Sequence, residues 1–239
     1  MNTSSRLRPG IGWTAAAAGL AAGAYAAYVG MAWCRYGRIS RASPQEADPL
    51  VDRFMPVYEV RGRHHIRIAA PPATTLAAAR DMDLLQSPVV RAILRARELV
   101  LRATPDTRPR PHGLLAEVQA LGWGVLADIP DRELVVGAVT QPWKANVVFR
   151  ALPPDEFAAF DEPGFVKIVW TLRADPIGAD QSLFSTETRV VSTDASARAR
   201  FRWYWSVFSP GMILIRRLSL GPVKAEAERR ARGRLPPSG

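Results

Sequence analysis

Residues 193–231 read TDASARARFRWYWSVFSPGMILIRRLSLGPVKAEAERRA, and this segment decides the fold. Thr193 and Asp194 offer capping side chains, and large apolar residues then recur at three- and four-residue steps, as on one face of an α-helix. The spacing predicts a long C-terminal helix over Ala195–Ala231. Its heavy aromatic face is formed by Phe201, Tyr204, Trp205, Phe208, Met212 and Ile215.

Two dipeptides inside this helix, Pro210-Gly211 and Gly221-Pro222, should kink or break it, because proline removes a backbone donor and clashes with the preceding turn. We therefore expect a bent helix wrapped over a curved sheet. Arg202, Arg216 and Arg217 disfavour a membrane span here.

The segments before this helix have the two-residue alternation of half-buried strands. Phe165–Ala174 places Ile168 and Trp170 on one side and Lys167 and Arg173 on the other. Further strands are predicted at Tyr58–Ala70, Trp123–Asp128, Glu133–Val139, Asn146–Leu152 and Leu183–Val191. Together they predict an antiparallel meander with one face in solvent and the other under the last helix.

Two helices are predicted between the first and second of these strands. Ala73–Leu85 has helix-forming residues after Pro71 and Pro72. Ser87-Pro88 is a favourable start for a second helix, with a capping hydroxyl followed by proline in the first turn. The expected fold class is therefore α+β, with a curved antiparallel sheet gripping a long C-terminal helix.

The N-terminal region predicts a membrane anchor, because Ile11–Cys34 is uncharged and long enough to cross a bilayer. A signal peptide cleaved near Ala24-Tyr25-Ala26 and a soluble alanine-rich helix are the alternatives. We expect a single-pass protein whose domain is cytoplasmic, since a chain without disulfides shows no adaptation to an oxidising compartment. The expected order is a terminal segment, transmembrane helix, linker, domain and basic tail over residues 1–10, 11–34, 35–54, 55–223 and 224–239.

Composition bounds the remaining possibilities. The chain has 239 residues, 48% of them hydrophobic, which suits one well-buried core. Its net charge of +10 is spread diffusely and lacks nucleic-acid-binding motifs, so we expect a membrane partner and no nucleic acid. Cys34 is the single cysteine, which excludes an intramolecular disulfide and a cysteine metal cage.

This order of elements resembles the START-like, or SRPBCC, superfamily. The resemblance is carried by the Ser185–Val190 run STETRV before Thr193-Asp194, and by Arg200, Phe201, Arg202, Tyr204 and Trp205 in the final helix. It covers roughly Phe54 to Ala231. It implies a helix-grip fold with a deep hydrophobic cavity for lipids, steroids, polyketides or hormones. A minority of the superfamily are enzymes such as polyketide aromatase/cyclases.

A cavity of this kind needs inward-facing apolar residues and a few polar groups that orient a ligand. The predicted ligand-binding residues are His64, Trp123, Ile168, Trp170, Phe184, Thr188, Tyr204, Phe208 and Met212. The same residues would equally fill a solid core.

The sequence therefore suggests a membrane-anchored binding or carrier protein for a hydrophobic small molecule or lipid, without a cofactor. One alternative is a polyketide cyclase- or dehydratase-like enzyme in which His64 or a cavity tyrosine is the acid or base. A membrane-tethered interaction domain with a filled core is another.

Other motifs do not indicate chemistry. Gly122-Trp123-Gly124 resembles a dinucleotide-binding turn, but Asp128-Ile129-Pro130 leaves no room for the helix that such a turn requires. His64 and His65 are adjacent on a strand and point to opposite faces, so they predict no metal site. Glu187 and Arg189 share one side of their strand, and we favour an ion pair on the outer surface of the sheet over a buried pair in the cup.

Overall fold

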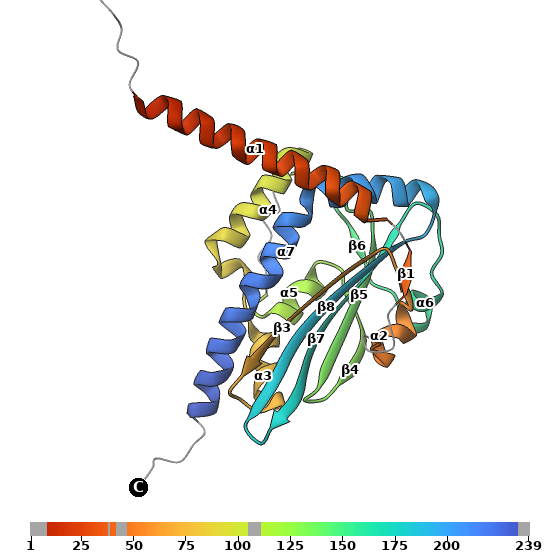
Figure 1. Cartoon of the computed structure of the whole chain (residues 1–239). Coiled ribbons are helices and arrows are strands. Elements are labelled where there is room, and N and C mark those ends of the chain that lie inside the picture. Colours follow the sequence, from red (N-terminus) through yellow and green to blue (C-terminus); the bar gives the residue numbers. More distant parts are fainter. Residues whose placement is uncertain (1–8, 38, 42–46, 105–110, 234–239) are drawn as a thin grey trace, which may run out of the picture.

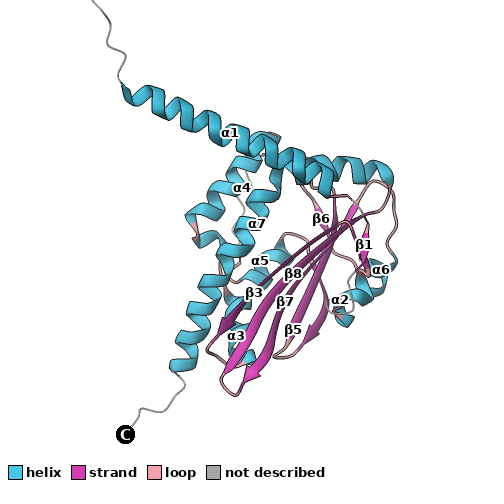
Figure 2. Cartoon of the chain, viewed as in Figure 1, coloured by secondary structure: helices cyan, strands magenta, loops and turns pink. Residues whose placement is uncertain are grey.

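The computed structural model describes residues 9–37, 39–41, 47–104 and 111–233. Within these residues a six-stranded antiparallel sheet forms the centre of an α+β fold (Figures 1 and 2). Its strand order is β3 (Val60–Ile68), β8 (Gln181–Ser192), β7 (Val166–Gly178), β5 (Glu133–Thr140) and β4 (Gly124–Ile129), with β6 (Phe149–Arg150) paired to the end of β5. The short strands β1 (Ser40–Arg41) and β2 (Val57–Tyr58) pair separately.

One face of the sheet is concave and lies against the long helix α7 (Ala195–Arg232), as the sequence predicts. Helices α3 (Pro72–Asp81), α4 (Pro88–Leu101) and α5 (Leu114–Ala120) and the 3₁₀ turn η1 (Leu84–Gln86) lie on the same side. A curved antiparallel sheet against a long C-terminal helix is the helix-grip arrangement, so the predicted fold class is confirmed in its α+β part.

The cap of α7 is the predicted one: the Asp194 carboxylate accepts a hydrogen bond from the Ala197 amide at 2.8 Å. The helix does not break at its prolines, and Pro210 and Pro222 both lie inside it. Figure 1 shows instead that α7 changes direction along its length, which agrees with the expected kink.

The local predictions hold best where capping or alternation is strong. Ser87 caps α4 by accepting from the Val90 amide at 3.4 Å, and the hairpin of β4 and β5 forms where expected. The strand predicted over Asn146–Leu152 is reduced to β6, and α5 is a helix that the sequence did not predict.

The opposite face, called the outer face below, is not left to solvent, so that prediction is wrong. Helices α2 (Pro49–Phe54) and α6 (Pro154–Ala159) cover it, and every residue of β5 is buried. Val51 and Phe54 of α2 pack there with Phe157 of α6. The linker predicted over 35–54 therefore ends in a helix that belongs to the core, because Val51 and Phe54 pack against the outer face of the sheet.

The N-terminal helix α1 (Pro9–Arg35) lies across α7 (Figure 1). The hydroxyls of Tyr25 and Tyr28 contact the Val207 carbonyl and the Ser209 hydroxyl of α7, and the Arg202 guanidinium lies 4.6 Å from the Trp33 ring centroid.

The predicted membrane location is wrong: among the described residues, no helix combines the length and apolar character that crossing a bilayer requires. The α1 segment is rich in alanine and glycine rather than leucine, which keeps its hydropathy low. Residues 1–8 of the predicted N-terminal segment lie outside the described residues.

The basic tail predicted from residue 224 begins inside α7. Lys224 donates to the Arg67 carbonyl at 2.9 Å, Ala227 is fully buried, and Arg230 pairs with Asp81 of α3 at 2.8 Å. Residues 224–232 are therefore part of the folded domain, and 234–239 lie outside the described residues.

Candidate functional site

The register of the central strands determines which side chains face α7. Val60, Gly62 and His64 of β3 lie opposite Val190, Thr188 and Thr186 of β8. Because side chains alternate across a strand, these positions share the concave face, and the residues between them point to the outer face.

Three adjoining cavities lie on the side of the sheet that faces α7, two of them against the concave face itself. The β3 cavity, of about 390 Å³, is bordered by β3, β8 and α7. The α5 cavity, of about 230 Å³, lies among η1, α5, α7 and the strands β7 and β8. The α4 cavity, of about 510 Å³, lies between α4, α7 and the segment before β6. Phe149 and Met212 border all three, so the cavities form one divided hollow.

Most walls of this hollow are apolar. Trp170, Leu172 and Phe184 of the sheet border the α5 cavity, and Ile168, Val190 and Phe201 border the β3 cavity. Volumes of a few hundred cubic ångströms with apolar walls and a few polar groups are typical of small-molecule sites.

The structure brings eight of the nine predicted ligand-binding residues to these walls. His64, Ile168 and Thr188 border the β3 cavity, and Trp170 and Phe184 border the α5 cavity. Trp123 and Met212 border both, and Tyr204 borders the β3 and α4 cavities. Phe208 does not border them and packs against the Tyr204 ring, with centroids 4.9 Å apart. Ligand binding by these residues remains a prediction.

Two of the predicted side chains already have hydrogen-bond partners. The Trp170 indole N–H donates to the Thr186 hydroxyl at 2.6 Å, and the Tyr204 hydroxyl accepts from Arg97 Nε at 3.1 Å. These bonds fix the orientation of both rings in the wall.

Gly62 is a site residue that the sequence analysis missed. It borders the β3 cavity, and a Cβ added to it would meet no atom within 4 Å. A glycine inside a strand costs stability but leaves space for a close approach. The signal was present, because Gly62 interrupts the alternation of Val60, His64, Ile66 and Ile68.

Arg216 was also missed. It borders both the α5 and β3 cavities, with its guanidinium carbon 4.3 Å from the Trp170 ring centroid. Protein atoms surround this group although the side chain keeps some surface beside the cavities, and burial lowers the pKa of Arg216 to about 9.

The electrostatics of His64 follow from the same neighbourhood. Burial, together with the positive charges of Arg217, Arg216 and His65, holds the pKa of His64 below its ordinary value. The ring is therefore mostly neutral at pH 7, which leaves one nitrogen able to accept a proton or a hydrogen bond.

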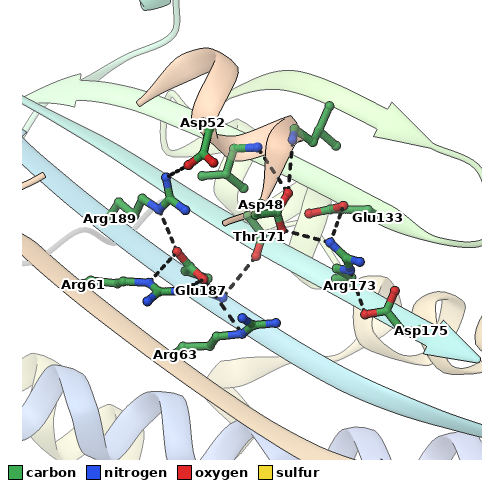
Figure 3. A network of polar contacts seen from close by, with 12 residues as sticks. Asp48, Asp52, Arg61, Arg63, Glu133, Thr171, Arg173, Asp175, Glu187 and Arg189 are labelled. Atoms are coloured by element: carbon green, nitrogen blue, oxygen red, sulfur yellow. Dashed lines mark hydrogen bonds and ion pairs between the residues drawn. The ribbon is translucent and has the colours of Figure 1, made fainter. Parts of the chain in front are cut away.

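The outer face carries a network of ion pairs, shown in Figure 3. Arg189 of β8 is fully buried and donates to Glu187 at 2.6 Å, to Asp52 of α2 and to the Met55 carbonyl at 2.9 Å. Arg61 of β3 binds Glu187 at 2.9 Å. The predicted side for Glu187 and Arg189 is right, but they are buried beneath α2 rather than on the surface.

A second part of this network centres on Arg173, which contacts Asp175 at 2.7 Å, Asp48 at 3.0 Å and Glu133 at 3.7 Å (Figure 3). Asp48 also caps α2 by accepting from the Leu50 amide at 3.1 Å. Burial and the nearby Asp48 charge raise the pKa of Glu133 to about 7. The network therefore fastens α2 to the sheet.

The two faces differ in what they can do. The described residues contain no cluster of three or more histidine, cysteine or acidic side chains that could hold a metal. The concave hollow can enclose an apolar molecule and offer it His64, Thr188 and Arg216 as polar contacts.

Comparisons with known proteins add little to this geometry. No family model and no curated protein matches the chain. Among solved structures, a hypothetical protein from Helicobacter pylori is similar with 8% identity over 79% of this chain and 96% of that chain, at a TM-score of 0.36. A conserved protein from Geobacillus kaustophilus has 9% identity over 73% and 96%, at 0.32. An aromatase/cyclase from a Streptomyces species has 14% identity over 72% and 94%, at 0.26. With these TM-scores below 0.5, the proposals below rest on the residues of this chain.

Proposed function

We propose that this protein binds a hydrophobic small molecule or lipid in the hollow between the concave face of the sheet and α7. The observation that carries the proposal is the set of adjoining cavities with apolar walls at that place. Gly62 supports it, because a cavity-facing glycine in the middle of a strand weakens the strand and leaves the hollow open. On this proposal the protein is a receptor or carrier.

The first test is binding of Nile red, an uncharged lipophilic dye, followed by organic extraction and mass spectrometry of the purified full chain. We expect saturable binding near one dye per chain and a lipophile in the extract. A chain that binds no dye and yields no lipophile contradicts the proposal.

Gly62→Leu provides the sharper test, since the new side chain extends into the β3 cavity without a clash at its Cβ. It should weaken dye binding by about tenfold or more, because even small excess volume is strongly disfavoured in a well-defined apolar pocket. His65→Leu is the matched control, as His65 lies on the same strand, is exposed and faces away. Equal binding by both variants would place the dye elsewhere.

A cyclase- or dehydratase-like enzyme that uses the same hollow is the second candidate. It is favoured by His64, a mostly neutral imidazole on the cavity wall that could abstract a proton next to a carbonyl. With a poly-β-ketone substrate analogue, His64→Gln should abolish turnover and keep Nile red binding. Absence of turnover by the unmodified chain would exclude this candidate for that substrate class.

A further inference from the structure

Arg216 is a charged side chain in an apolar place. It enters the hollow from α7, between the β3 and α5 cavities, and stacks over the Trp170 ring. Among the residues that the structure describes, none forms a hydrogen bond or ion pair with its guanidinium. Its guanidinium carbon lies 4.3 Å from the centroid of the Trp170 ring.

Placing the Arg216 guanidinium in apolar surroundings lowers the stability of the folded protein. A guanidinium taken from water without a partner loses its hydration, and the cation–π contact with an aromatic face recovers only part of this loss. At pH 7 the group is still charged, since its pKa of about 9 lies above that pH. The cost falls when an anion enters the hollow and pairs with it.

The charges around the cavities favour the same conclusion. Arg217 also borders the β3 cavity, and no carboxylate is among the described side chains that border it. Glu117 borders the α5 cavity, but no ion pair joins it to Arg216. Among the described residues, the charges that border the β3 cavity near Arg216 are therefore positive.

We propose that the ligand is an amphiphile with an anionic group, a carboxylate or a phosphate monoester, which Arg216 binds while the apolar body fills the β3 and α5 cavities. This inference rests on the proposed function and adds the chemical class of the ligand. The planar guanidinium can donate two parallel hydrogen bonds to either anion. Stacking on the Trp170 ring restricts the orientation of the guanidinium.

The test compares three ligands with the same sixteen-carbon chain: hexadecanoate, hexadecyl phosphate and 1-hexadecanol. Each is titrated against bound Nile red at pH 8, below its aggregation concentration. We expect at least one anion to displace the dye at about 30-fold lower concentration than the alcohol, which is the usual loss when a buried charge pair lacks one member. The stronger of the two anions identifies the headgroup.

Arg216→Met should remove this preference by weakening the anion about 30-fold while the alcohol binds as before. Arg216→Lys keeps the positive charge but loses the planar guanidinium, so it should retain part of the preference for the anion. Arg217→Met is the matched control, because Arg217 is exposed on the next position of α7 and also borders the β3 cavity. Retained Nile red binding shows that each variant is folded.

Three outcomes decide the inference. An alcohol that competes as well as both anions, or equal losses in Arg216→Met and Arg217→Met, overturns it and leaves the proposed function standing. A chain that binds neither dye nor any of the three ligands contradicts the proposed function itself. A preference that depends on Arg216 alone supports the inference.

Discussion

The two sides of the sheet differ in how their arginines are paired and in how tightly their glycines are packed. On the outer face the buried Arg189 meets Glu187 and Asp52, and a Cβ on Gly137 would lie 2.5 Å from Leu126. On the concave side, Arg216 of α7 has no ion-pair partner among the described residues, and a Cβ on Gly62 would meet no atom within 4 Å. The buried arginine of the outer face is paired within the chain, whereas we propose that a bound molecule pairs with the arginine that borders the concave hollow.

Breaking the outer network should have the largest effect. Arg189→Met leaves Glu187 and Asp52 without a fully buried partner, so the free energy of unfolding should fall by about 3–5 kcal/mol. Urea denaturation followed by tryptophan fluorescence measures it. Arg63→Met is the control, because its contact with Glu187 is 3.9 Å long and largely solvated, and it should cost less than about 1 kcal/mol. Similar losses in both variants would contradict the buried role of Arg189.

The second effect is a pH dependence of the outer face. The pKa of Glu133 is raised to about 7 by burial and by Asp48, so the folded state holds a proton that the unfolded state releases near pH 4.5. Stability should therefore fall by up to about 3 kcal/mol as the pH rises from 4.5 to 7, and level off above.

Glu133→Gln should flatten this dependence, since a neutral amide mimics the protonated carboxyl. Stability curves collected between pH 4.5 and 8 provide the measurement. Glu162→Gln changes an exposed partner of Arg150 and should leave the profile unaltered. An unchanged slope in Glu133→Gln would show that another group titrates in this window.

Substitutions at Gly137 and Gly62 compare how tightly the two sides of the sheet are packed. Gly137→Ala forces Leu126 and Phe157 to move and should cost about 1–3 kcal/mol. Gly62→Ala adds a methyl group to open space and should be neutral or raise stability by about 0.5 kcal/mol. Thermal unfolding of the two variants gives the answer, and a loss at Gly62 equal to that at Gly137 would mean that the concave face is packed.

The smallest expected effect concerns Arg216 in the ligand-free chain. Replacing a partly desolvated charge that has no ion-pair partner among the described residues relieves desolvation, so Arg216→Met should raise the free energy of unfolding by about 1 kcal/mol. Arg217→Met should change it little, because that side chain is exposed. Destabilisation by Arg216→Met in denaturant titrations would mean that the guanidinium is already stabilised by the fold.

Much of the sheet could be predicted from the sequence because its signals are local. The alternation in β3 and β7 follows from period two, and Ser87 and Asp194 are caps that act within one turn. Most residues of the cavity walls could be predicted from the same periodicities. Once one side of a strand or helix is assigned to the interior, its aromatic residues are assigned to the interior as well.

The missed features depend on partners distant in sequence. The helices α2 and α5 have six and seven residues, too few to be stable alone, and they form because Phe54 and Leu114 pack into the cores on the two sides of the sheet. Asp52 and Arg189 are buried together although 137 positions separate them. The membrane prediction failed because absence of charge was weighed above the low hydropathy of alanine and glycine in α1.

Pro210 separates the part of α7 that α1 contacts from the part that carries Met212 and Arg216. Proline has no amide hydrogen, so the hydrogen-bond ladder is interrupted between the part that Tyr25 and Tyr28 of α1 contact and the part that carries Met212 and Arg216. The second part can open without the first, in separate events of amide hydrogen exchange. An occupant of the α5 cavity, which is bordered by Met212, Ile215 and Arg216, would then slow amide exchange beyond Pro210.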